Sequence, residues 1–326
     1  MNFHEFTTQV ISEMRRRFPG YDIQVQEVPK LQGESYTGMA IHPSGGDIAL
    51  TMDLEALFDR FRNDLYLGNP MKAIEREIKE AVAQMPQFDS EALTNYERMK
   101  EKLTLQLVPS AKNKDLLADI PHRNIEDMAL AYRFDIGHNE RTFFSIVVTN
   151  KMLDAYGISA AQLHDDALEA ASHSCPATLR NMNEVIRNMA GQTDPSPMWV
   201  ASIENGQNGA CVIQYPHFLD DAAETLGGSF YVLPSSIHEV LLLADDTSPS
   251  LSELENMVRT INQAEVAPEE RLSDNVFHYD CESHIFENAR TFEARLSAVE
   301  QSVANAELFE AAKPNTMTVL LVQPNA

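Results

Sequence analysis

The feature that most constrains the fold is a pair of β-forming segments, residues 128–134 and 143–148, joined through the sequence Gly-His-Asn-Glu at residues 137–140. Met128, Leu130, Tyr132 and Phe134 are spaced two residues apart, so they share one face of an extended strand. The return segment, Phe-Phe-Ser-Ile-Val-Val, is rich in aromatic and β-branched residues. A short turn joins antiparallel neighbours, and the sequence therefore predicts a β-hairpin within an antiparallel sheet.

Helices with clear start and stop signals surround this hairpin. The first covers residues 3–18, with apolar residues at three- and four-residue steps that end at Pro19-Gly20. Ser159 and Ser250 each begin a capping-box pattern, and Asn150 is the expected cap of a helix that ends at Gly157. Further helices are predicted at residues 54–65, 69–86, 90–103, 160–171, 216–228 and 248–264. Further strands are predicted at residues 21–28, 35–42, 46–53, 103–108, 229–233, 239–245 and 273–280, with a second hairpin at 198–215.

These elements predict an α+β fold in which antiparallel or mixed β-hairpins pack against helices. A chain of 326 residues exceeds what one apolar core usually serves. We therefore expect an N-terminal α+β region at residues 1–103, a C-terminal α+β region at 104–280 and a helical tail at 281–326.

The tail carries an apolar repeat of its own. Ile285, Ala289, Phe292, Leu296, Val299 and Val303 follow one another at steps of 4, 3, 4, 3 and 4 residues. This repeat predicts an amphipathic helix with a heptad seam about three heptads long. The seam has two readings that the sequence leaves open: packing back onto the body, or self-association through residues 285–306.

Charge and cysteine content limit the environment and the partners. The chain has 49 acidic and 25 basic residues, a formal net charge of −24, which disfavours ordinary binding to nucleic acid or to an anionic membrane. Three cysteines without a C-x-x-C pair fit a reducing compartment better than a disulfide framework. No apolar run is long enough to span a bilayer and no signal peptide is evident, so we expect a soluble, cytoplasmic protein.

The corner from Ser235 to Glu239, in the sequence Leu-Pro-Ser-Ser-Ile-His-Glu-Val, is the first candidate catalytic site. Ser236, His238 and Glu239 are the residue types of a hydrolase triad. Ser236 and Glu239 also have the S-x-x-E spacing of a cap, and no G-x-S-x-G surrounds either serine. We favour the structural interpretation, in which the corner joins two strands.

The second candidate is a metal site at His278, Cys281 and His284. Imidazole and thiolate are ligands that zinc prefers. His278 is expected in a strand and His284 in the following helix, so the three-residue spacing does not align the ligands on one element. The Asp-Asp pairs at 165–166, 220–221 and 245–246, and His164 beside the first of them, are expected on solvated surfaces. No motif for a nucleotide or another cofactor is present, and we expect no cofactor.

Four segments together resemble one known family. They are LLADIPHRNIEDMALAYRFDI, TNKMLDAYGISAAQLHDDAL, NGACVIQYPHFLDDAAETLGGSFYVLPSSIHEVLLLADD and NQAEVAPEERLSDNVFHYD, which lie between residues 116 and 280. In order and spacing they resemble the bacterial family catalogued as domain of unknown function 5688. The resemblance covers roughly residues 1–280, is looser near the N-terminus and leaves the tail outside. It implies a cytoplasmic bacterial α+β protein, encoded near mobile elements, and it supplies no catalytic residues.

Two classes of function remain at this point. The first, which we favour, is a non-enzymatic accessory protein of mobile elements that binds another macromolecule, a protein whose identity the sequence does not give. Within it, carboxylates arranged in a stripe would allow the acidic surface to mimic nucleic acid. The second is a hydrolase or metal-dependent enzyme that uses the Ser235–Glu239 corner or the His278, Cys281 and His284 set.

Overall fold

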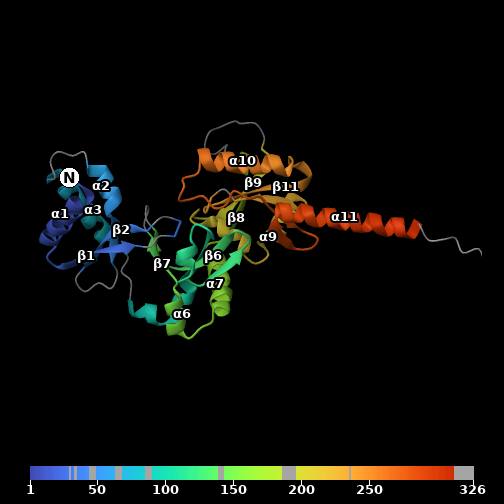
Figure 1. The fold of residues 1–326 in the computed structure, drawn as a ribbon. Coiled ribbons are helices and arrows are strands. Elements are labelled where there is room, and N and C mark those ends of the chain that lie inside the picture. The colour runs from blue at the N-terminus through green and yellow to red at the C-terminus, as the bar shows by residue number, and fades with distance from the viewer. Residues whose placement is uncertain are drawn as a thin grey trace, which may run out of the picture.

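A computed structural model describes residues 1–28, 31–32, 35–43, 49–62, 68–84, 90–138, 143–185, 196–234 and 236–311. In these residues the chain forms three antiparallel sheets with helices packed on them, as the sequence predicts for an α+β fold. Figure 1 shows the N-terminal sheet and its helices at one end, the other two sheets in the middle, and the last helix projecting from the opposite end.

The N-terminal unit is a three-stranded sheet covered by helices. Its elements are α1 (Phe3–Arg17), β1 (Tyr21–Val28), β2 (Tyr36–Pro43), β3 (Leu50–Asp53), α2 (Leu54–Phe61) and α3 (Gly68–Gln84), with strand order β1-β2-β3. The apolar stripe of α1 is buried at Phe6, Val10 and Met14, against Ile74 and Ile78 of α3. An Asn2–Glu5 capping box starts α1, so local capping and burial of one face both favour this helix.

The second sheet is built around the long strand of the predicted hairpin. Its strands are β4 (Leu103–Pro109), β5 (His122–Ile125), β6 (Met128–His138) and β7 (Phe143–Val147). Strand β4 pairs with one edge of β6, and β5 and β7 pair with the other edge. Both strands of the hairpin are confirmed, and residues 139–142 of its turn lie outside the described residues. The flanking helical elements are η1 (Ser90–Thr94), α4 (Tyr96–Met99), η2 (Lys100–Lys102), α5 (Lys114–Leu117), α6 (Asn150–Tyr156) and α7 (Ala160–Ser174).

The third sheet has six strands in the order β13-β12-β10-β11-β9-β8. Its strands are β8 (Ala177–Asn181), β9 (Met198–Ile203), β10 (Phe230–Leu233), β11 (Val240–Ala244), β12 (Phe277–Asp280) and β13 (Ile285–Asn288). The helical elements beside it are η3 (Gly209–Gln214), α9 (Phe218–Leu226), η4 (Asp245–Thr247), α10 (Leu251–Ala264) and α11 (Ala289–Ala311).

Strand β10 is buried on both faces. Phe230 and Val232 belong to a large core shared with the second sheet, while Tyr231 and Leu233 pack toward α10. The large core also takes in Tyr96 and Met99, so these residues group with the C-terminal part of the chain rather than with the N-terminal core. The division of the chain at residue 103 stays a prediction, but core membership changes before it, between Val82 and Ala92.

The prediction of a second hairpin at 198–215 is wrong in its return strand. Strand β9 is present, but residues 209–214 form the 3-10 helix η3, whose first five residues are buried. Strand β9 instead pairs with β8 and β11. Gly209 permits the close packing of η3, because a Cβ there would lie 2.5 Å from the carbonyl oxygen of His238 and 2.7 Å from the amide nitrogen of Ile203.

The structure also corrects the start of the tail helix. Residues 285–288 form β13, which pairs with β12, and α11 begins only at Ala289. Ile285 therefore lies on an edge strand and not on the helical seam. His284 adopts a left-handed conformation, with φ of 56°, which allows the tight reversal between the two strands. An available sheet edge outweighs the helical periodicity of the first heptad.

Three smaller predictions also change. Thr149 rather than Asn150 caps α6, since the Thr149 side chain accepts a hydrogen bond from the N–H of Met152. Residues 90–103 form three short helical pieces instead of one helix, with Asn95 capping the middle one. His164 is buried in α7, not at the surface. Its ring nitrogens contact the Tyr132 hydroxyl and the Arg123 guanidinium, and burial lowers its pKa.

The tight contact at Gly209 gives a stability prediction. The substitution Gly209→Ala forces backbone atoms apart, so we expect the free energy of unfolding to fall by about 3 kcal/mol. Gly206→Ala, three residues earlier, meets nothing within 4 Å and costs only its left-handed conformation, about 1 kcal/mol. Urea unfolding of both variants checks this, and equal losses would contradict the packing argument.

Candidate functional site

In the Ser235–Glu239 corner, the side chains of Ser236 and His238 form hydrogen bonds with backbone N–H groups. Ser235 lies outside the described residues. The Ser236 hydroxyl accepts a hydrogen bond from the His238 N–H at 3.0 Å, and Ser236 forms an isolated β-bridge with Arg271. Glu239 is exposed. The hydroxyl therefore stabilises a tight turn two residues long, and the S-x-x-E spacing does not begin a helix here.

The His238 ring points to other partners than Ser236. Its Nδ1 accepts a hydrogen bond from the Asn208 N–H at 3.2 Å, and its Nε2 lies 3.5 Å from Glu270. The His238 carbonyl accepts a hydrogen bond from the Ser202 hydroxyl at 2.7 Å. A general base needs a ring nitrogen free to accept the proton of the nucleophile. Here Nδ1 accepts the Asn208 N–H and so helps to position the loop at residues 205–208, and Nε2 faces Glu270 instead of Ser236.

The three candidate metal ligands have different surroundings in and after strand β12. His278 in β12 is fully buried under α11, and its Nε2 lies 3.3 Å from Asp245. Cys281 follows the strand and contacts the Ser229 hydroxyl at 3.4 Å. His284 is exposed and contacts Asp220, which also binds the hydroxyl of Tyr279. His278 and Tyr279 point to opposite faces of β12, so His278 and His284 do not converge.

The Asp-Asp pairs are likewise engaged with separate neighbours. Asp166 accepts a hydrogen bond from Tyr96, Asp220 from Tyr279, and Asp245 contacts His278. Within the described parts of the chain, no group of three or more His, Cys, Asp and Glu residues is placed to hold a metal ion. None of the helices in those parts has the length and apolar character needed to cross a membrane.

A different cluster, which the sequence did not single out, joins the tail helix to the body. Arg290 donates two hydrogen bonds of 2.6 Å to the buried carboxylate of Glu255 in α10. Arg295 contacts Asp280 at 3.0 Å and Glu287 at 2.8 Å. The Asp280 pKa falls to about 2, mainly because Ser283 donates a hydrogen bond to it and also because Arg295 does. These contacts fix the first two turns of α11.

An aromatic contact completes this junction. The Phe292 ring stacks on the His278 imidazole with centroids 3.6 Å apart and an angle of 13° between the rings. Burial lowers the pKa of His278, which keeps the ring neutral between Phe292 and Tyr231. The signal in the sequence was the placement of charge: Arg290 and Arg295 are the basic residues of segment 285–311, and both lie in its first turns.

Beyond Arg295, α11 leaves the body. Leu296 is 43% exposed and Val299 is 55% exposed, whereas Phe292 is only 7% exposed. Figure 1 shows the helix continuing away from the sheets with no other element beside it. The apolar seam of the tail is therefore buried at Phe292 and exposed at Leu296 and Val299. The part of the helix beyond Arg295, residues 296–311, is called the free half of α11 below.

Comparison with known proteins identifies the family of the chain but no characterised relative. The profile of the family of unknown function DUF5688 matches residues 3–281 of the chain. The chain belongs to this family. No curated protein and no solved structure matches it. The match confirms the resemblance found in the sequence and ends before α11, so the tail helix lies outside the part that defines DUF5688.

The buried His278 predicts a pH dependence of stability. Its pKa is below 6.5 in the folded chain, while the unfolded chain has the ordinary value. As the pH falls below about 6.5, the unfolded state takes up a proton that the folded state does not, so the free energy of unfolding decreases. His278→Phe keeps the stack on Phe292 and removes the proton site. We expect this variant to lose less stability than the wild type between pH 6.5 and 5.

Urea unfolding at several pH values measures this effect. The exposed His173 gives the matched control His173→Gln, for which we expect the wild-type dependence. Some dependence remains in His278→Phe, because the pKa of His164 is lowered as well. Identical slopes for His278→Phe and the wild type would contradict the assignment of a buried, neutral imidazole.

Proposed function

We propose that this DUF5688 member is a non-enzymatic accessory protein that binds another protein through the free half of α11. The partner offers an apolar groove edged with basic residues. The observation that carries the proposal is the exposure of Leu296 and Val299 on a helix whose base is fixed to the body. A helix laid in a groove is a common mode of recognition, with anchors at positions i, i+3 and i+7. Leu296, Val299 and Val303 have this spacing.

The charge of the free half favours a basic partner over a second copy of the chain. Residues 296–311 contain Glu300, Glu307 and Glu310 and no lysine or arginine. Glu293 and Glu300 are exposed and, at about 100° per residue, follow one edge of the apolar seam. Two such helices would repel one another, and the net charge of −24 adds to this. A partner with an apolar groove would bind the apolar seam, and basic residues at the edge of that groove would pair with Glu293 and Glu300.

The fixed base of α11 favours binding. Arg290 and Arg295 orient the helix, so a partner meets a preformed helix at a defined angle. Less conformational entropy is then lost on association than when a disordered segment folds on binding. Arg290 and Arg295 hold the helix to the body, while Leu296 and Val299 remain exposed for the partner.

The non-enzymatic part of the proposal is supported by the geometry of the two candidate catalytic sets. Ser236 and the Nδ1 atom of His238 accept hydrogen bonds from backbone N–H groups. His278 is buried against Phe292, whereas His284 lies in the turn after β12 and contacts Asp220. The cytoplasmic setting is supported by the free cysteines, which persist as thiols under reducing conditions. The association with mobile elements rests on the family resemblance alone.

The test compares two double variants of the full chain. In Leu296→Asp/Val299→Asp the seam becomes charged, while Ala294→Asp/Ala298→Asp places the same two charges on the opposite, exposed face of the helix. Affinity purification from the native host identifies proteins retained by the wild type. We expect a basic protein whose binding is weakened at least tenfold by the seam variant, left unchanged by the control, and weakened by salt.

Two outcomes would contradict this function. The first is a retained partner that binds the seam variant and the wild type equally, which would place the interface elsewhere. The second is a stable dimer of the wild type, seen by sedimentation and lost only in the seam variant, which would assign the free half to self-association. Binding is measured with the purified partner, so that capture alone does not decide the question.

A further inference from the structure

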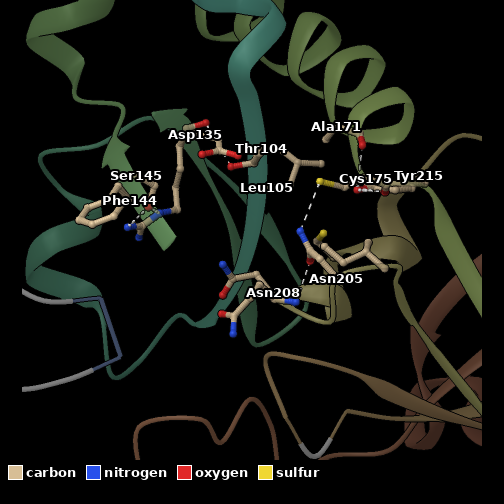
Figure 2. A pocket seen from close by; sticks show the side chains of 14 residues that line it. Thr104, Leu105, Asp135, Phe144, Ser145, Ala171, Cys175, Asn205, Asn208 and Tyr215 are labelled. Atoms are coloured by element: carbon tan, nitrogen blue, oxygen red, sulfur yellow. Dashed lines mark hydrogen bonds between the residues drawn. The ribbon is translucent and has the colours of Figure 1, made fainter. Parts of the chain in front are cut away.

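A polar hollow lies between the second and third sheets, far along the chain from α11. About 60 Å³ of it can hold the centre of a water-sized molecule, and the hollow is open to solvent. One wall comes from the second sheet and carries Arg133, Asp135 and Ser145. The opposite wall comes from the end of α7 and the loop after β9, and carries Cys175 and the amides of residues 205, 207 and 208. Figure 2 shows Asp135 and Ser145 on one side, Cys175 and Asn205 on the other, and Thr104 and Leu105 between them.

Among the described residues, the hydrogen-bond acceptors of the Arg133 guanidinium are neutral. Its Nε and one terminal nitrogen donate to the Ser145 hydroxyl at 2.9 and 2.7 Å, and the other terminal nitrogen donates to Gln106 at 2.9 Å. These bonds use three of its five N–H groups, which leaves one on each terminal nitrogen. Among the described residues, no carboxylate lies within 4.0 Å of this guanidinium. Burial lowers the pKa of Arg133, the expected sign for a cation held without a counter-ion.

The Asp135 carboxylate is the complementary group. One of its oxygens accepts the N–H of Gly137 at 2.8 Å, at the β-bulge of β6, and no cation of the described residues pairs with it. It lies close enough to Cys175 to contribute to the raised pKa of that thiol, after burial, which is the larger cause. Arg133 and Asp135 thus share one hollow without pairing with each other. A buried charge is costly unless something compensates it.

We propose that this hollow binds a small zwitterion of the amino-acid class, with its carboxylate on Arg133 and its ammonium on Asp135. A planar carboxylate offers two oxygens to the two remaining N–H groups of a guanidinium. An ammonium group offers the donors that the Asp135 carboxylate lacks. A doubly charged phosphate fits less well, because Asp135 would repel it.

The rest of the lining fits this ligand class. Leu105, Phe144, Ala171 and Ile203 give apolar surface for a small side chain. Burial raises the pKa of Cys211 to about 12 and also raises that of Cys175, so both thiols stay protonated and poorly nucleophilic. The hollow is thus suited to holding a ligand rather than to attacking it.

His238, in the Ser235–Glu239 corner, supports one wall of the hollow. His238 accepts the N–H of Asn208, and its carbonyl packs against Gly209 and accepts the Ser202 hydroxyl. The corner therefore fixes the loop that forms one wall of the hollow. His238 positions the loop and is not itself part of the lining of the hollow.

The experiment uses Cys175 as a reporter in the wild-type chain. Cys175 is half-buried in the wall of the hollow, whereas the half-buried Cys281 lies beside Ser229 on another part of the third sheet. Alkylation of both thiols by iodoacetamide is followed by mass spectrometry, with single L-amino acids, acetate or methylamine present. We expect at least one small amino acid to slow the alkylation of Cys175 without changing that of Cys281, and acetate and methylamine to have little effect.

Variants assign the two charges. Arg133→Gln and Asp135→Asn each retain polar contacts to the fold, and we expect each to weaken protection about tenfold or more, as for loss of a charge-assisted hydrogen bond. Arg62→Gln/Asp59→Asn removes an exposed Arg–Asp pair of α2 and serves as the matched control. Thermal unfolding with and without the amino acid gives a second measure of binding in each folded variant.

Three results would overturn the assignment. The first is that no amino acid protects Cys175 or raises the unfolding temperature. The second is that protection persists unchanged in Arg133→Gln or in Asp135→Asn. The third is that acetate protects as strongly as the amino acids, which would leave Asp135 without a role. All three are independent of α11, so the hollow and the protein-binding function succeed or fail separately.

Discussion

The fold depends on the burial of β10 on both faces. Phe230 and Val232 face the core shared with the second sheet, and Tyr231 and Leu233 face α10. A strand buried in this way needs cover on each side. On the α10 side the cover is completed by Ala289 and Phe292 at the base of α11, which explains why that base is fixed by ion pairs and a ring stack. Beyond this base, Leu296 and Val299 are exposed and contribute little to the cover of the sheet.

Charge pairing differs between the junction at the base of α11 and the hollow. Arg290 and Arg295 meet carboxylates directly, and the pairs on α1 and α3 do so as well. In the hollow, Arg133 and Asp135 remain apart. An uncompensated charge in a folded chain is destabilising, so a ligand of opposite charge would stabilise it. Apolar surface shows a similar contrast, because Phe292 at the base of α11 is buried while Leu296 and Val299 beyond it are exposed.

Local signals in the sequence predicted much of this fold. The capping box at Ser250, the left-handed Gly157 and the alternation from Met128 to Phe134 each act within a few residues, so their outcome can be read from the sequence. Errors arose where distant segments decided. Residues from Gly209 on form a 3-10 helix that packs against the His238 backbone, where a strand was predicted. Ile285 pairs with the edge of β12, where a helix was predicted. Neither the unpaired Arg133 and Asp135 of the hollow nor the Arg290–Glu255 contact could be predicted, because both depend on how elements distant in the sequence pack together.

The central claim is that α11 consists of a base that belongs to the fold and a free half that does not. Hydrogen–deuterium exchange of the unbound chain, followed by mass spectrometry, tests it most directly, since amide protection ranges from none to the global stability. The account predicts protection at residues 289–295 equal to that of α10. At residues 296–311 it predicts the lower protection of a helix that is held at one end, and an increase in that protection when the partner is bound. Equal, strong protection along all of α11 in the unbound chain would contradict it.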